Sequence, residues 1–109
     1  METPGPRRRL FVNRMGVESL LKLPKNIQRQ TLRKMETIEA APESAGYPLR
    51  KPLQGFRGIH SGRYRIIWRL LTLEEGEVAA EVVYAGIRSE GDGRDAYAEL
   101  QRLFNTLDL

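Results

Sequence analysis

The strongest constraint on the fold comes from the stretch Gly55 to Arg69, which reads GFRGIHSGRYRIIWR. From Arg63 onward the residues alternate between an apolar, aromatic face and a face rich in arginine. The first face carries Tyr64, Ile66, Trp68 and Leu70, and the second carries Arg63, Arg65, Ile67 and Arg69. Alternation with a period of two, in β-branched and aromatic residues, predicts a half-buried β-strand.

The arginine-rich face of this strand places three guanidinium groups within seven residues. Side chains on one face of a strand recur every two residues, so neighbouring guanidiniums stand roughly 7 Å apart. Such a row repels itself unless an anion lies across it, which favours binding of a polyanion. The alternative is a solvated strand face whose arginine stems cover apolar surface.

The charge of the chain is unevenly distributed. Residues 1–69 hold 15 Lys/Arg and 5 Asp/Glu, a balance of +10, whereas residues 70–109 hold 3 and 9, a balance of −6. A basic region of this density indicates contact with phosphates, the sequence-independent part of nucleic-acid affinity. Charge alone does not distinguish RNA, DNA and an acidic protein as the partner.

Length and composition narrow the possible classes of protein. A chain of 109 residues predicts a single domain (1–109) with one modest core. There is no cysteine, no apolar run near the ~18 residues that span a bilayer, and no apolar stretch after the charged start that would indicate a secretory signal. We therefore expect a cytoplasmic protein. The sequence shows no motif for a metal, nucleotide or acyl-transfer site, and we expect no cofactor.

The first half of the chain predicts a strand followed by a helical hairpin. After a frayed tail (1–7) come a short strand (9–12) and a helix that Asn13 caps. The buried stripe expected for this helix is Val17, Leu20 and Leu21. A second helix begins after Pro24 and ends before Pro42, and its expected stripe is Ile27, Thr31, Met35 and Ile38. The hairpin covers residues 14–41.

The second half predicts strands and a terminal helix. Residues 45–54 are rich in turn formers and indicate a loop, followed by a strand (55–59), a turn at Ser61-Gly62 and the arginine-rich strand. A polar turn (74–77), an apolar strand (78–87), a flexible acidic loop (89–93) and a helix (95–107) complete the order β-α-α-β-β-β-α.

Four motifs in this order resemble the RelE/ParE superfamily of toxins from type II toxin–antitoxin modules. They are Leu53-Gln-Gly55, Ser61-Gly-Arg-Tyr-Arg-Ile-Ile-Trp68, Ala85-Gly-Ile-Arg88 and Asp95-Ala-Tyr97. The resemblance spans nearly the whole chain. It implies a small α+β domain in which an N-terminal strand and a helical hairpin pack on a twisted antiparallel sheet, with a short C-terminal helix. It also implies that the helices lie on one face of the sheet and that the functional surface is concave.

The resemblance also implies site residues. RelE-like members cleave mRNA, many of them in the ribosomal A site, and their motifs match Arg65, Arg88 and Tyr97 here. Where the family often shows Lys or Arg before the turn, this chain has Arg57, Gly58 and His60. The general base is therefore open, with His60 as one candidate. The basic residues expected to contact RNA are Arg57, Arg63, Arg69 and Lys51.

The expected chemistry is attack of the RNA 2′-OH on the adjacent phosphorus. Guanidiniums suit the charge that develops there, which points to Arg65 and Arg88. For Arg65 the alternative is a surface cation, and for Arg88 a salt bridge to the acidic C-terminal part. His60 has the only side chain whose unperturbed pKa lies near neutrality, but it could also be an inert histidine beside a turn. Tyr97 could donate a proton, stack on a base or only pack the helix.

Three functions follow from this combination. The favoured one is an mRNA endoribonuclease toxin that acts with the ribosome and is neutralised by a cognate antitoxin protein. The second is a ParE-like poison of DNA gyrase, which would not need the three motif residues. The third is a non-catalytic family member that is stable only when bound to its antitoxin.

Overall fold

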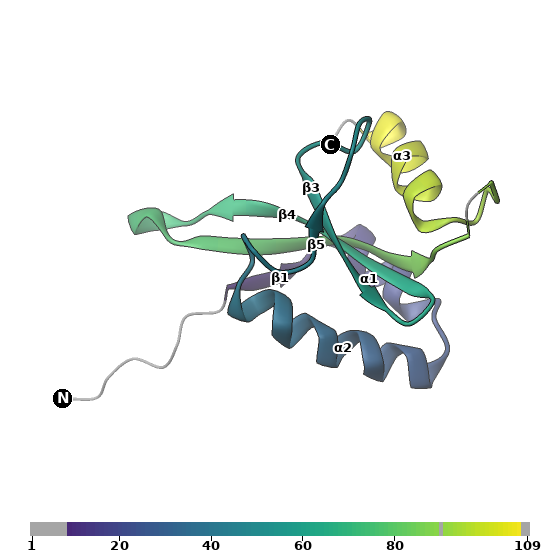
Figure 1. Cartoon of the computed structure of the whole chain (residues 1–109), viewed down its shortest axis with the longest axis horizontal. Coiled ribbons are helices and arrows are strands. Elements are labelled where there is room, and N and C mark those ends of the chain that lie inside the picture. The colour runs from purple at the N-terminus through teal and green to yellow at the C-terminus, as the bar shows by residue number, and fades with distance from the viewer. Residues whose placement is uncertain (1–8, 90, 108–109) are drawn as a thin grey trace.

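The computed structural model describes residues 9–89 and 91–107, and it forms helices on both faces of a five-stranded sheet (Figure 1). The helices are α1 (Arg14–Leu21), α2 (Lys25–Ala40) and α3 (Ala96–Leu107). The strands are β1 (Leu10–Val12), β2 (Tyr47–Pro48), β3 (Phe56–Ser61), β4 (Tyr64–Thr72) and β5 (Val78–Ile87), with a 3₁₀ turn, η1 (Glu74–Gly76), before β5. The tail expected at 1–7 lies outside the described residues. No helix within the described ranges has the length and apolar character of a membrane span.

The strands lie in the order β1-β5-β4-β3-β2, and the predicted α+β class is confirmed. Neighbouring strands are antiparallel except β1 and β5, which pair in parallel, so the sheet is mixed rather than antiparallel throughout. A parallel pair needs a long connection, and here the connection is the whole chain between the two strands. No local pattern in the sequence signals such a pairing. The short strand β2 was also not predicted, because it lies inside the turn-rich stretch.

Helix α1 begins where the sequence predicted but buries a different side. The Asn13 side chain accepts a hydrogen bond from the Gly16 N–H (2.8 Å), as expected of an N-cap. Val17 and Leu21 are 41% and 66% exposed, however, and Leu20 is half-buried. The reason is a close approach of backbones: a Cβ atom on Gly16 would lie 2.6 Å from the Val82 carbonyl oxygen of β5.

The part of α1 in closest contact with β5 is therefore small and polar, while Met15 beside it is buried in the core. Ser19 is buried, and its hydroxyl donates to the Gly16 carbonyl (2.8 Å) and accepts from the Ala85 N–H of β5 (2.9 Å). This pair of hydrogen bonds ties the helix to the sheet. In α2 the predicted stripe is confirmed for Thr31, Met35 and Ile38, which are buried, while Ile27 is half-buried.

The alternating strand β4 divides the core into two layers. Ile66 and Trp68 pack with residues of α2 on one face, which we call the α2 face. Ile67 packs with Leu100 of α3 on the other, which we call the α3 face. Figure 1 shows these two helices on opposite sides of the sheet, so the expectation that the helices share one face was wrong. The predicted alternation is thus confirmed through Trp68, whose indole N–H donates to the Pro42 carbonyl (2.9 Å).

The hairpin that joins β3 to β4 orients the arginine-rich face. Strand β3 continues to Ser61, two residues further than predicted, and the turn residues are Gly62 and Arg63. Gly62 has φ +60°, the conformation that favours glycine at the first position of a type II′ turn. This tight turn fixes the register of the hairpin and so determines which side chains share a face.

Candidate active site

The strand register brings several predicted residues to the α3 face. Residues directly opposite in an antiparallel pair point to the same face, and Arg65 lies opposite both His60 of β3 and Gly86 of β5. Arg88 follows Gly86 by two residues, and its N–H donates to the Arg63 carbonyl (2.9 Å), which extends the ladder. His60, Arg65 and Arg88 therefore converge on one side of the sheet.

The N-terminus of α3 completes this group through Asp95, which is 3% exposed. One carboxylate oxygen accepts from the N–H groups of Tyr97 (3.1 Å) and Ala98 (3.3 Å), which makes Asp95 the N-cap of the helix. The other oxygen accepts from the Ser89 N–H (2.6 Å) and pairs with Arg88 Nη1 (2.7 Å). Asp95 thereby joins the end of β5 to the start of α3.

These contacts determine the charge of Asp95. Burial raises its pKa, but hydrogen bonds from the Arg88 guanidinium and from the N–H groups of Ser89 and Ala98 outweigh burial, as does the Arg88 charge. The net pKa lies below its ordinary value, so Asp95 is ionised at neutral pH. The ion pair between Arg88 and the C-terminal part of the chain, one of the two alternatives for this residue, is thus present.

The same arrangement places Arg88 against Tyr97. The guanidinium carbon of Arg88 lies 4.3 Å from the centroid of the Tyr97 ring, within the range of a cation–π contact. Arg88 is consequently held on two sides, by the Asp95 carboxylate and by the aromatic ring. A guanidinium fixed in this way needs no reorganisation when a phosphate arrives.

Tyr47 of β2 also belongs to this face, and the sequence did not predict it. It pairs with Gly58 of β3, and its hydroxyl oxygen lies 2.9 Å from the hydroxyl oxygen of Tyr97. Its ring meets the His60 ring edge-on, with 5.3 Å between centroids. Residue Gly58 forms the floor beneath both tyrosines, because an added Cβ would lie 3.3 Å from the Tyr97 hydroxyl and 3.4 Å from the Tyr47 ring.

The Tyr97 hydroxyl is held in its protonated form. Burial raises its pKa well above the ordinary value, and the hydrogen bond and the proximity of Tyr47 raise it further. The positive charges of Arg65 and Arg88 oppose this rise without reversing it. Tyr97 therefore cannot act as a base at neutral pH, but it can donate a proton.

Arg65 is a cation of this face that has no acidic partner among the described residues. Its guanidinium donates to the carbonyl oxygens of Gly62 (3.3 Å) and Tyr64 (3.0 Å), which are neutral groups. Among the described residues no carboxylate forms an ion pair with it. Arg65 is thus oriented by the turn while it keeps its full charge for an anionic ligand.

The remaining arginines predicted to contact RNA do not join this group. Arg57 lies opposite Trp68 on the α2 face, and both its Nε (3.0 Å) and Nη2 (2.9 Å) donate to the Ala45 carbonyl. Arg69 lies on the α3 face but forms an ion pair with Glu81 of β5. Arg63 is exposed in the hairpin turn beside the group. Within the row of Arg63, Arg65 and Arg69, the described residues supply an acidic partner to Arg69 alone.

Lys51 lies at a cleft next to Tyr97. The cleft has a volume of about 470 Å³ and opens between the loop after β2 and the first turns of α3. Leu49 and Leu53 give it an apolar floor, while Lys51 and Arg88 line it with positive charge. A space of this kind, apolar below and cationic at the rim, suits a nucleobase and its phosphate.

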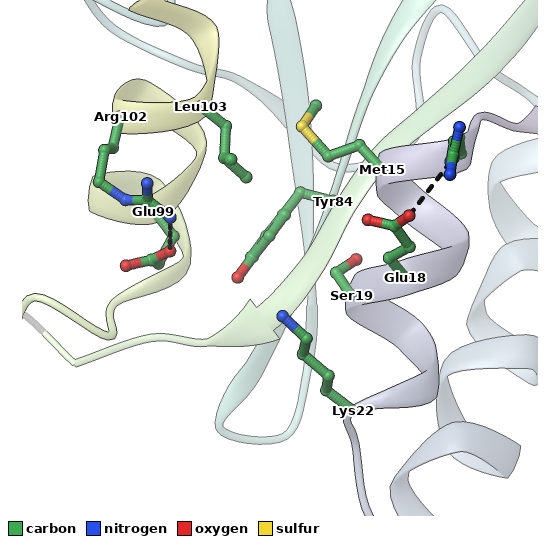
Figure 2. Close-up of a pocket in the computed structure, with 9 residues that line it drawn as sticks. Met15, Glu18, Ser19, Lys22, Tyr84, Glu99, Arg102 and Leu103 are labelled. Carbon is green, nitrogen blue, oxygen red and sulfur yellow. Dashed lines mark hydrogen bonds and ion pairs between the residues drawn. The ribbon is translucent and has the colours of Figure 1, made fainter. Parts of the chain in front are cut away.

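A second pocket, of about 360 Å³, lies on the other side of α3, between that helix and α1 (Figure 2). Its charges are largely balanced in place: Arg102 pairs with Glu99 (2.9 Å), and Arg14 pairs with Glu18 (3.2 Å). The cleft beside Tyr97 differs in that Arg50 and Lys51 line it without an acidic partner among the described residues. Within the part of the chain that the structure describes, no group of three or more His, Asp or Glu side chains is arranged to hold a metal ion.

No protein-family model matches the sequence, and no curated protein is similar enough to match it. Solved structures do match. The RelBE2 toxin–antitoxin complex from Mycobacterium tuberculosis superposes with a TM-score of 0.63 and 22% identity, over 74% of this chain and 98% of that chain. The isolated E. coli RelE toxin superposes with a TM-score of 0.59 and 18% identity, over 89% of this chain and 99% of that chain. A YoeB/ParE toxin from Agrobacterium tumefaciens superposes with a TM-score of 0.59 and 11% identity, over 74% of this chain and 99% of that chain.

These similarities extend over nearly the full length of the known toxins. At such low sequence identity they concern the arrangement of the backbone, and they agree with the element order, the mixed sheet and the helical hairpin of this chain. The chain therefore has the fold of the RelE/ParE superfamily of toxins, as its motifs predicted.

Proposed function

We propose that this chain is the toxin of a type II toxin–antitoxin pair and that it cleaves mRNA as an endoribonuclease. The observation that carries the proposal is the convergence of Arg65, Arg88 and Tyr97 on the α3 face, next to a cleft with a cationic rim. A gyrase poison would not require this convergence. The fold of RelE toxins supports the same class of function.

In the proposed reaction the RNA 2′-OH attacks the adjacent phosphorus, leaving a 2′,3′-cyclic phosphate and a 5′-OH end. The substrate supplies its own nucleophile, so the reaction requires no metal ion. Arg65, whose charge is not balanced, is the principal partner of the phosphoryl oxygens. Arg88, already paired with Asp95, adds a second positive charge in a fixed position.

Proton transfer is divided between two other side chains. Tyr97 gives its proton to the leaving 5′-oxygen, because its raised pKa keeps it protonated until that oxygen becomes more basic. His60 is our candidate for the base that accepts the 2′ proton. It is exposed on the same face, directly opposite Arg65 in the strand register.

The proposed partners follow from the relatives with the same fold. Several of these were solved as complexes of RelE with RelB antitoxins. We infer that a cognate antitoxin neutralises this chain, and that the target is mRNA on the ribosome. Such a target places the activity in the cytoplasm and makes inhibition of translation and growth the outcome.

The test is cleavage of a defined mRNA by the purified chain in the presence of ribosomes, with Arg65→Ala as the control. We expect discrete cuts that leave 2′,3′-cyclic phosphate and 5′-OH ends. Cuts that leave 3′-OH and 5′-phosphate ends, which arise when water attacks the phosphorus in place of the 2′-OH, would contradict the mechanism. Intact mRNA together with trapped gyrase–DNA complexes would favour the gyrase alternative instead.

A further inference from the structure

We propose that Tyr47 is a positioning residue of this site, which holds the Tyr97 hydroxyl for transfer of its proton to the leaving 5′-oxygen of RNA. The inference rests on the proposed function and assigns a role to a residue outside the recognised motifs. The juxtaposition that carries it is the pair of hydroxyl groups 2.9 Å apart, contributed by β2 and α3. These residues are 50 positions apart in the chain.

The packing around the two tyrosines fixes the positions of their hydroxyl groups. Gly58 leaves room for both rings, since any side chain there would press on the Tyr97 hydroxyl, the Tyr47 ring and the Leu49 side chain. Both tyrosines are half-buried and pack against the core cluster that contains Leu49 and Leu100. The His60 ring contacts the Tyr47 ring edge-on. The position of each hydroxyl is therefore set by packing.

A tyrosine hydroxyl can both donate and accept a hydrogen bond, so the two hydroxyl groups can exchange the roles of donor and acceptor during the reaction. Before the reaction, Tyr97 can donate to Tyr47. As the bond from phosphorus to the 5′-oxygen breaks, the proton of Tyr97 moves to that oxygen and leaves a phenolate. The Tyr47 hydroxyl then turns to donate to the phenolate oxygen, and Arg65 and Arg88 lie close enough to stabilise its charge.

Replacing Tyr47 by phenylalanine keeps the ring and removes only this donor. A hydrogen bond to a charged group contributes enough that we expect the rate of cleavage to fall roughly ten- to a hundredfold. Binding of the RNA should change little, because Tyr47 acts through Tyr97. The matched control is Tyr64→Phe, which removes a hydroxyl from the start of β4, on the α2 face, where no described residue forms a hydrogen bond with it.

The decisive substrate is an RNA in which the leaving 5′-oxygen at the cleaved bond is replaced by sulfur. A thiolate leaves without being protonated, so it has no need of Tyr97 or Tyr47. Single-turnover rates are measured on ribosomes programmed with the oxygen and the sulfur mRNA, for the unmodified chain, Tyr47→Phe and Tyr64→Phe. We expect Tyr47→Phe to be slow with oxygen and restored with sulfur.

Each other outcome overturns a distinct claim. Equal rates of Tyr47→Phe and the unmodified chain on the oxygen RNA would remove Tyr47 from the site. A defect that persists with sulfur would show a purely structural role for Tyr47 and contradict the inference. Failure of the unmodified chain to cut either RNA would overturn the proposed function, and this inference with it.

Discussion

The two faces of the β3–β4 hairpin use arginine for opposite purposes. On the α2 face, Arg57 lies opposite the buried Trp68 and binds a backbone carbonyl of the loop that follows α2. On the α3 face, Arg65 lies opposite His60, has only neutral partners among the described residues and stands near Tyr97. One guanidinium therefore fixes a loop, whereas the other keeps its charge for a ligand.

This difference shows that the partners of an arginine, more than its place in a basic stretch, indicate its function. Arg69 supports the point, because it shares the α3 face with Arg65 but is neutralised by Glu81 on the next strand. A phosphate that approaches the sheet would therefore be attracted more strongly to Arg65 than to Arg69.

The largest effect is expected for Arg65→Ala. Loss of a guanidinium aimed at the transition state should lower the rate of cleavage on the order of 10²-fold or more. The free energy of unfolding should hardly change, because a partly exposed strand arginine adds little stability. Cleavage kinetics and thermal unfolding of the same preparation measure both quantities. An active Arg65→Ala protein would remove the contrast.

The next largest effect is expected in the salt dependence of RNA binding. If Arg65, Arg88 and Lys51 each contact a phosphate, the affinity for single-stranded RNA should fall roughly 20-fold between 50 and 200 mM salt, from a slope of about 0.7 per contact. Arg65→Ala should make the slope shallower by about one contact, whereas Arg57→Ala should leave it unchanged. A flat titration of the unmodified chain would contradict contact with a polyanion on either face.

A pH-dependent effect is expected from Asp95, which fixes Arg88 on the α3 face. Because the folded protein lowers the pKa of Asp95, the stabilisation is complete above about pH 4, the ordinary value for aspartate, and is lost as the pH falls through the lowered pKa. Asp95→Asn keeps an N-cap but loses the ion pair, which should cost about 2 kcal/mol at neutral pH.

Denaturant unfolding between pH 2 and 7 measures this contribution. The difference in stability between the two proteins should shrink toward the acid end of the range. A difference that stays constant with pH would show that the Asp95 charge does not stabilise the fold.

The smallest effect is expected for Arg57→Ala on the α2 face. Removing the two hydrogen bonds to Ala45 should lower the free energy of unfolding by about 1–2 kcal/mol. Cleavage per folded molecule should not change, since this side chain points away from Tyr97. Slower cleavage at unchanged stability would place Arg57 in the site after all.

The sequence predicted those features that depend on local periodicity and capping. The alternation around Ile66 and Trp68, the cap at Asn13 and the stripe of α2 were confirmed. The burial of α1 was predicted wrongly, because its contact with β5 depends on the absence of a side chain at Gly16 and on the buried Met15, and not on the predicted Val17 and Leu21. Hydrophobic patterns give no signal for such a close approach of backbones.

The site was predictable only where a motif marked it. Arg88 and Tyr97 are brought together as their motifs implied, but Tyr47 lies in a turn-rich stretch, and its contact with Tyr97 depends on a two-residue strand that no pattern indicates. Arg57 and Arg65 point to different faces of the sheet because of the strand register. This register is known only once the hairpin turn is placed. A Tyr-Pro pair before a glycine-containing strand is the only trace of Tyr47 in the sequence.

Cleavage of mRNA by the α3 face is best tested by a map of mRNA 5′ ends in cells that express the chain. Cells that express Arg65→Ala at the same level are the control. We expect new 5′-OH ends at discrete positions within coding regions for the unmodified chain and their near absence for Arg65→Ala. Growth arrest with an unchanged map of 5′ ends, or identical maps for the two proteins, would contradict it.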